Sequence, residues 1–142
     1  VGSSDLEDPA DAGGTPAFAP PEQLLGETQD TAADCYSLAA IVYFALSGTP
    51  PYGETEVRSI LARALARDVD LSAFPDEIAD WLRRGLDPEV SKRFQDAAVM
   101  QRAWREAVRA VAQRERRAPW WRRWLGGEDV GGLWGSDEPA GA

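Results

Sequence analysis

The stretch GGTPAFAPPEQL at residues 13–24 places a hydroxyl and a carboxylate inside a segment rich in glycine and proline. The hydroxyl belongs to Thr15 and the carboxylate to Glu22. Gly14 lets the backbone turn where a side chain would clash, and three prolines restrict the backbone around it. Residues 1–22 are dominated by glycine, serine, aspartate and proline without any period, so they are predicted to form a loop.

Few other side chains in the sequence can do chemistry. The chain has no histidine and one cysteine, Cys35, which excludes a Cys/His metal site and any mechanism that needs a histidine base within this chain. We therefore expect no metal site. A lone cysteine cannot form an internal disulfide, so the cytoplasm is the expected compartment. Cys35 itself begins an apolar stretch and is expected to be a small core residue.

Charge is unevenly distributed along the 142 residues, a length that predicts one domain. The net charge is −9, yet residues 102–123 hold eight arginines against two glutamates. The first 57 residues contain ten acidic side chains and no basic one, and the last nineteen are acidic again. The longest apolar run, residues 38–46, has nine residues and is too short to span a membrane. No signal peptide opens the chain and its first residue is valine, so we expect it to begin inside a longer protein.

Four helices are predicted, and no strand-like alternation competes with them. Residues 31–47 are apolar nearly all round, which indicates a buried helix. Thr31 and Asp34 resemble a capping box at its start, and Gly48 followed by two prolines ends it. Three amphipathic helices are expected at about residues 57–67, 76–86 and 96–114. The fold class is therefore mostly α, with an irregular loop over residues 1–22, a helical part over 23–114 and a disordered linker or tail over 115–142.

Three stretches of the sequence together resemble the serine/threonine protein kinases. GGTPAFAPPEQL resembles the end of their activation segment, where the family carries Gly-Thr-x-x-Tyr/Phe-x-Ala-Pro-Glu. DCYSLAAIVYFALSGTPPYG resembles the buried F helix and the loop after it, and LDPEVSKRFQDA resembles the Asp-Pro-…-Arg element before the last helix. The three motifs occur in the same order as in the family, and they are most similar in type to those of bacterial kinases. The resemblance covers roughly residues 14–113 and implies the C-terminal part of the large lobe of a kinase catalytic domain.

The resemblance implies a substrate-docking loop, whose candidate residues are Gly14, Thr15, Pro16 and Phe18. In the family, the threonine that matches Thr15 faces the catalytic aspartate and helps to distinguish serine/threonine from tyrosine substrates. A hydroxyl that serves only the turn is the alternative for Thr15. Ser3 and Ser4 would fall in the activation loop and, with Thr15, are candidate phosphorylation sites, or else plain loop residues.

The resemblance also implies two structural roles. Glu22 matches the glutamate of the family's Ala-Pro-Glu and Arg93 the arginine that pairs with it, so a buried bidentate ion pair is expected. Two unrelated surface charges are the alternative. Asp34 matches the F-helix aspartate, which accepts backbone N–H groups from the catalytic loop, although it could also serve only its own helix. Pro20 stands where the family has alanine, a departure that an extended stretch should tolerate.

The motifs that handle ATP are absent from this sequence. It contains no glycine-rich phosphate loop with its lysine, no His-Arg-Asp catalytic loop and no Asp-Phe-Gly metal site. Phosphoryl transfer depends on positioning and on neutralising phosphate charge, which those residues and magnesium supply. We therefore expect no catalytic residue and no cofactor in this chain, and no kinase activity from the chain alone. The resemblance implies Mg-ATP as the cofactor of the parent kinase, that is, of the longer kinase to which this chain would belong.

The stretch APWWRRWLGG near the C-terminus carries Trp120, Trp121 and Trp124 beside two arginines. Tryptophan and arginine both favour the headgroup region of membranes, so contact with a membrane surface is one interpretation. Nucleic-acid binding by stacking is conceivable but not expected, because the stretch is short, is broken by proline and precedes acidic residues. A linker is favoured over membrane contact and over a docking site for another protein.

The leading hypothesis is the C-terminal portion of a cytoplasmic bacterial serine/threonine kinase domain, whose partners are a protein substrate and the missing kinase portion. A non-catalytic interaction module and a peripheral membrane protein are the alternatives. Because the residue 31–47 helix is apolar on every side, part of it should lack cover in this chain. We expect an exposed apolar patch near Ile41, Tyr43 and Phe44, low stability and self-association.

Overall fold

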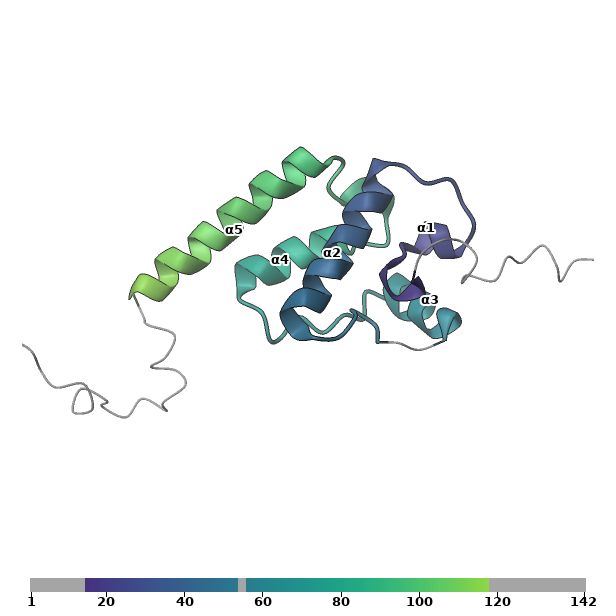
Figure 1. Cartoon of the computed structure of the whole chain (residues 1–142), viewed down its shortest axis with the longest axis horizontal. Helices are drawn as coiled ribbons and strands as arrows, with labels where there is room; N and C mark the ends of the chain where they lie inside the picture. The colour runs from purple at the N-terminus through teal and green to yellow at the C-terminus, as the bar shows by residue number, and fades with distance from the viewer. Residues whose placement is uncertain (1–14, 54–55, 118–142) are drawn as a thin grey trace, which may run out of the picture.

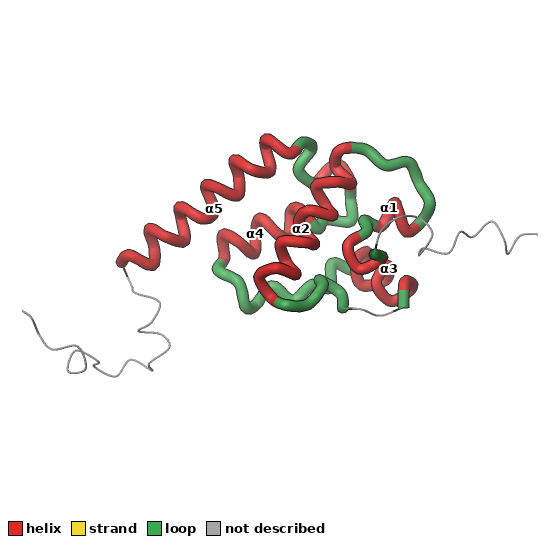
Figure 2. The backbone as a smooth tube through the Cα atoms, in the orientation of Figure 1, coloured by secondary structure: helices red, strands yellow, loops and turns green. Residues whose placement is uncertain are grey.

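The computed structural model describes residues 15–53 and 56–117, and within these ranges the chain is helical and contains no strand (Figures 1 and 2). This confirms the predicted mostly α architecture. The helices and short 3-10 turns, in chain order, are η1 (Pro16–Phe18), α1 (Pro21–Leu24), α2 (Thr31–Ser47), α3 (Val57–Leu65), α4 (Asp76–Gly85), η2 (Val90–Lys92) and α5 (Ala97–Arg117).

The central helix, α2, begins one residue earlier than the capping-box expectation implied. Asp30 has extended backbone dihedrals, and its carboxylate accepts the N–H of Ala32 at 2.9 Å, so Asp30 is the N-cap. The expected pairing of Thr31 with Asp34 is wrong, because Thr31 is already the first helical residue. The predicted end is confirmed: Gly48 adopts a left-handed φ of 82°, and its N–H donates to the Phe44 carbonyl at 2.8 Å.

The main core forms where α2, α4 and α5 meet, and α4 contacts both of the other helices (Figure 1). The crossing of α2 and α4 is close because Gly85 has no side chain: a Cβ placed there would lie 2.5 Å from the Cβ of Ala39. Trp81 of α4 packs on Trp104 of α5 with ring centroids 4.8 Å apart. Its indole N–H donates to the Met100 carbonyl at 3.0 Å, so the polar end of this buried ring is satisfied.

A second, smaller cluster lies between α3, α1 and the loop that follows α2. It consists of Tyr52, Ile60 and Ala64, with Leu24 of α1 packed against it. The guanidinium of Arg63 stacks over the Tyr52 ring at 5.5 Å and donates to the Tyr52 carbonyl at 3.1 Å. This cluster therefore joins the segment after α2 to α1, which follows the proline-rich loop.

The C-terminal helix continues beyond its expected end. Residues 115–117, which composition grouped with the tail, complete α5, because glutamate and arginine are good helix formers. Arg114 stays in the helix and binds the Glu77 carboxylate of α4 at 2.8 Å. Among the described residues, no helix is both long and apolar enough to cross a bilayer.

Candidate functional site

The candidate docking loop occupies the start of the described chain. Thr15 is exposed and precedes η1, and its carbonyl accepts the N–H of Phe18 at 3.1 Å. The Phe18 ring meets the Phe44 ring of α2 edge-on, with centroids 5.7 Å apart. Pro20 has an extended backbone, with φ −68° and ψ 157°, so proline fits the position where the resemblance expected alanine. Pro20 and Pro21 are both fully buried, so the loop packs firmly on the helical core.

Several predicted residues fall outside the described part of the chain. They are the docking-loop residue Gly14, the candidate phosphorylation sites Ser3 and Ser4, and the tail residues Trp120, Trp121 and Trp124.

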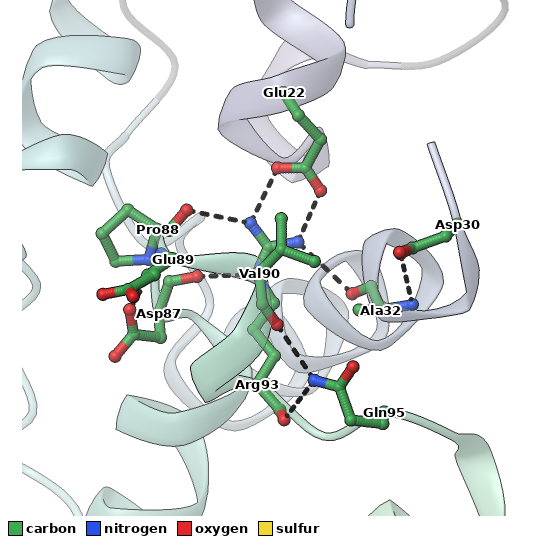
Figure 3. Close-up of polar contacts among 9 residues, drawn as sticks. All are labelled: Glu22, Asp30, Ala32, Asp87, Pro88, Glu89, Val90, Arg93 and Gln95. Atoms are coloured by element: carbon green, nitrogen blue, oxygen red, sulfur yellow. Dashed lines mark hydrogen bonds and ion pairs between the residues drawn. The ribbon is translucent and has the colours of Figure 1, made fainter. Parts of the chain in front are cut away.

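The structure brings Glu22 and Arg93 into direct contact although 71 residues separate them in the sequence (Figure 3). The two terminal nitrogens of Arg93 each donate to a different carboxylate oxygen of Glu22, at 2.5 and 2.7 Å. The side chains are 0% and 6% exposed, for Arg93 and Glu22 respectively. Parallel bonds of this kind fix orientation as well as distance, and burial shields the pair from solvent. The first turn of α1 is therefore held against the segment before α5.

Arg93 makes further contacts that link three segments of the chain (Figure 3). Its guanidinium also donates to the carbonyls of Asp87 at 2.6 Å, Pro88 at 3.3 Å and Ala32 at 3.4 Å. Together with the bonds to Glu22, these account for all five N–H groups of the guanidinium. Its plane also lies over the Tyr36 ring, 4.9 Å from the centroid.

The turn that supplies these carbonyls has its own hydrogen bonds. The Asp87 carboxylate accepts the N–H of Glu89 at 2.9 Å and binds Arg67 at 3.1 Å. The Gln95 amide donates to the carbonyls of Val90 at 3.0 Å and Arg93 at 2.9 Å (Figure 3). Sequence reasoning identified neither Gln95 nor the acceptor carbonyls, since no side-chain pattern marks a backbone acceptor.

The second feature of the site is an uncovered apolar side of α2. We call Leu38, Ile41 and Phe44 the open face; their exposed fractions are 44%, 49% and 41%. Part of α2 therefore lacks cover in this chain, as expected. The expected patch is present at Ile41 and Phe44 but does not include Tyr43, which is 7% exposed. Tyr43 belongs to the main core and packs on the Phe74 ring, and its hydroxyl donates to the Asp70 carbonyl at 2.9 Å.

Asp34 lies at the N-terminal end of the open face. It precedes Leu38 by four residues and Ile41 by seven, a spacing that places the three on one side of a helix. Its side chain is exposed and makes no hydrogen bond to another described residue. Since Asp30 caps α2, the Asp34 carboxylate remains available to a partner that covers the open face.

Burial raises the pKa values of the three tyrosines, Tyr36, Tyr43 and Tyr52. The pKa of Tyr52 rises to about 12, and burial of its hydroxyl is the largest cause. Burial, followed by the neighbouring Asp34 carboxylate, also raises the pKa of the Cys35 thiol. Because the thiolate is the reactive form, Cys35 is protected from acting as a nucleophile.

The site can fix a loop and present a surface. Within residues 15–53 and 56–117, no group of three or more aspartate, glutamate, cysteine or histidine side chains could hold a metal ion. A proline-rich loop fixed by a buried Glu–Arg pair, beside a central helix with one open face, is the arrangement implied for the lower part of a kinase large lobe. The fold and the site thus define a helical segment of the protein kinase type.

Comparison with known proteins gives the same class. The chain is 34% identical over 101 residues to the DNA damage-responsive serine/threonine-protein kinase RqkA of Deinococcus radiodurans, covering 68% of this chain and 15% of that protein. It is 36% identical over 81 residues to the serine/threonine-protein kinase PknF of Mycobacterium tuberculosis, covering 56% and 16% respectively. It is 30% identical over 111 residues to the calcium/calmodulin-dependent protein kinase type 1 of Macrobrachium nipponense, covering 72% and 32%. No family model matches the chain.

The chain belongs to the protein kinase family, of which it is a segment with bacterial relatives. It spans less than a third of the length of each of these three relatives.

Proposed function

We propose that this chain supplies the substrate-docking loop and the helical scaffold of a serine/threonine protein kinase. The parent enzyme would transfer the γ-phosphoryl group of ATP to serine or threonine side chains of proteins. The observation that carries the proposal is the buried bidentate contact of Glu22 with Arg93, which fixes the end of the docking loop to the helical core.

The docking loop would present its exposed residues to a protein substrate. Thr15 lies at the exposed beginning of the fixed loop, and Phe18 packs on Phe44 of α2. In this position the Thr15 hydroxyl would face the catalytic aspartate supplied by the preceding part of the kinase. Pro16 restricts the backbone next to Thr15, so the substrate would meet a loop that is already ordered.

The open face of α2 would contact the preceding part of the kinase. Leu38, Ile41 and Phe44 would lose their exposure to water, and each fully buried side chain of this size contributes about 1.5–3 kcal/mol. The Asp34 carboxylate at one end of the face would accept backbone N–H groups of the catalytic loop. Catalysis of phosphoryl transfer is mostly positioning and charge stabilisation, so a scaffold that fixes the catalytic loop contributes to rate without touching ATP.

Mg-ATP would be bound by the parent kinase outside this chain, because the sequence contains none of the family's nucleotide-binding or metal-binding motifs. Bound magnesium would neutralise phosphate charge during transfer, while the residues described here would only position the loop and the scaffold. We place the parent kinase in the cytoplasm, where Cys35, the single cysteine of this chain, would stay reduced.

The proposal is tested by sequencing the DNA immediately upstream of the codon for Val1. The proposal expects the reading frame to continue upstream and to encode His-Arg-Asp-x-x-x-x-Asn followed by Asp-Phe-Gly. A promoter and start codon directly before this chain would contradict the proposal and favour a non-catalytic interaction module.

A further inference from the structure

Arg67 follows α3 and has the only positive φ, 55°, among the non-glycine residues that the structure describes. The turn that ends α3 uses this conformation: the Arg67 N–H donates to the Ala64 carbonyl at 3.1 Å, and the Asp68 N–H donates to the Arg63 carbonyl at 2.9 Å. Glycine adopts such a φ without strain, whereas the side chain of an arginine crowds the backbone there. The side chain of Arg67 should therefore contribute something that glycine at this position could not.

That contribution is an ion pair with Asp87, which lies 20 residues further along the chain. The Arg67 guanidinium is 3.1 Å from the Asp87 carboxylate, whose side chain is only 15% exposed. The same carboxylate oxygen accepts the N–H of Glu89 at 2.9 Å. Asp87 is therefore fixed from two sides at the start of the turn between α4 and η2.

The backbone of Asp87 continues this series of contacts toward the docking loop (Figure 3). Its carbonyl accepts the Nε–H of Arg93 at 2.6 Å, and the Pro88 carbonyl accepts a terminal N–H of Arg93 at 3.3 Å. Arg93 in turn donates to both carboxylate oxygens of Glu22. We call the contacts from Arg67 through Asp87 and Arg93 to Glu22 the polar path. Arg67 and Glu22 do not bond to each other, yet each step of the path is a direct contact.

A second ion pair of similar exposure has no such connection. Arg114 of α5 binds Glu77 of α4 at 2.8 Å, and the Arg114 side chain is 46% exposed, compared with 49% for Arg67. Within the described chain, neither Arg114 nor Glu77 bonds to Arg93 or Glu22. Because ion pairs of this exposure contribute little through attraction alone, the two pairs differ mainly in what they hold in place.

We propose that Arg67 is a positioning residue for the docking loop. By binding Asp87 it keeps the Asp87 carbonyl in place for Arg93, and Arg93 then holds Glu22 and the first turn of α1. Since α3 also packs directly on α1, the polar path adds orientation to a contact that already exists. This inference deepens the proposed function, because it rests on the docking role assigned to the loop.

The test measures amide hydrogen exchange by NMR, residue by residue, in the full 142-residue chain. The amide of Leu25 reports on α1, because it donates to the Pro21 carbonyl at 3.0 Å. The amide of Ala79 reports on the core, because it is buried in α4 and donates to the Pro75 carbonyl at 2.8 Å. The ratio of the Leu25 rate to the Ala79 rate therefore separates release of α1 from a loss of stability of the whole chain.

Two variants interrupt the polar path. Arg67→Gly removes the guanidinium and suits the left-handed backbone, so it should not weaken the end of α3. Asp87→Asn keeps an oxygen for the Glu89 N–H but removes the charge that binds Arg67. The control variant, Arg114→Gln, breaks the ion pair with Glu77. Far-UV circular dichroism verifies that all variants remain as helical as the unsubstituted chain.

The ratio should rise by at least about twofold in Arg67→Gly and in Asp87→Asn, the lower limit for residues coupled in one hydrogen-bond network. The variant with both substitutions should not exceed the larger single effect, because both interrupt the same path. Arg114→Gln should leave the ratio unchanged. The proposal is overturned if the ratio is unchanged in Arg67→Gly, if the two single effects multiply, or if the control raises the ratio equally.

The exchange experiment needs neither ATP nor a protein substrate. An unchanged ratio would therefore refute the role of Arg67 and leave the proposed kinase function standing. Conversely, a native-length polypeptide without kinase activity would contradict the proposed function and leave the coupling of Arg67 to Glu22 standing.

Discussion

The contact between Glu22 and Arg93 should dominate the stability of this chain, and a double-mutant cycle measures that directly. Glu22→Gln keeps the shape of the side chain but leaves the buried Arg93 guanidinium without a counter-charge. Arg93→Met removes all five guanidinium bonds and leaves the Glu22 carboxylate, 6% exposed, without a partner. Breaking a buried pair in this way costs about 3–5 kcal/mol.

The cycle separates the ion pair from the other contacts of Arg93. The bonds from Arg93 to backbone carbonyls are lost in both arms that carry Arg93→Met, so they cancel in the coupling term. The coupling between Glu22 and Arg93 should therefore lie well above the roughly 0.2–1 kcal/mol of an exposed pair. Free energies of unfolding are measured by urea titration followed by far-UV circular dichroism, with sucrose in all samples so that the weakest variant still folds.

Asp80 and Arg83 provide the matched control. They also form a short ion pair, at 2.6 Å, but their side chains are 75% and 58% exposed. The same cycle with Asp80→Asn and Arg83→Met should give a coupling within the range of exposed pairs. If the Glu22–Arg93 coupling is no larger than that of this control, the buried pair does not hold the docking loop and our reasoning is wrong.

Four further predictions concern the core, the open face and nucleotide binding. Folding raises the pKa values of the three tyrosines, to about 12 for Tyr52. The stability that the neutral tyrosines contribute is therefore fully present below their unfolded pKa of about 10, and it is lost as the pH rises through the folded pKa values. An alkaline titration of tyrosinate absorbance should show ionisation together with loss of helix, whereas titration near pH 10 in an intact helical chain would contradict this. Gly85→Ala should overpack the α2–α4 crossing and lower the free energy of unfolding by about 1–3 kcal/mol, and adding Ala39→Gly should restore it. An unchanged free energy of unfolding in Gly85→Ala alone would refute the close approach of the two helices. Leu38→Gln with Ile41→Gln should lower self-association and the binding of an apolar dye without lowering the melting temperature, and unchanged dye binding would mean that the open face is already covered. Calorimetric titration of the isolated chain with Mg-ATP should show no binding, and micromolar affinity would contradict the proposed division of roles.

The sequence predicted the elements of the fold better than their outer limits. Apolar periodicity located α3 and α4, and the glycine–proline signal located the end of α2 at Gly48. The N-cap was misassigned because Asp30 and Thr31 are both good capping residues, and only the backbone dihedrals decide between adjacent candidates. The end of α5 was placed three residues early because tail composition begins before the helix ends at Arg117.

The candidate site could be predicted only in part. Family resemblance paired Glu22 with Arg93, whereas neither periodicity nor spacing can join residues that are 71 positions apart. The open face was predicted from the excess of apolar surface on α2, correctly at Ile41 and Phe44 but not at Tyr43. Ile41 and Tyr43 are both large residues in the apolar run of α2, so the sequence does not distinguish them. Tyr43 contacts the Asp70 carbonyl and the Phe74 ring, which belong to the loop between α3 and α4, and a sequence pattern does not place that loop.

The central claim is that this chain is the substrate-docking and scaffold portion of a working serine/threonine kinase. The most direct test measures phosphoryl transfer from radiolabelled ATP to a generic protein substrate by the native-length polypeptide that contains this sequence. Our account predicts transfer to serine and threonine, a large loss with Glu22→Gln, and little change with the exposed control Asp80→Asn. A native-length polypeptide that transfers no phosphate under conditions where it is folded, or one whose activity is unaffected by Glu22→Gln, would contradict the account.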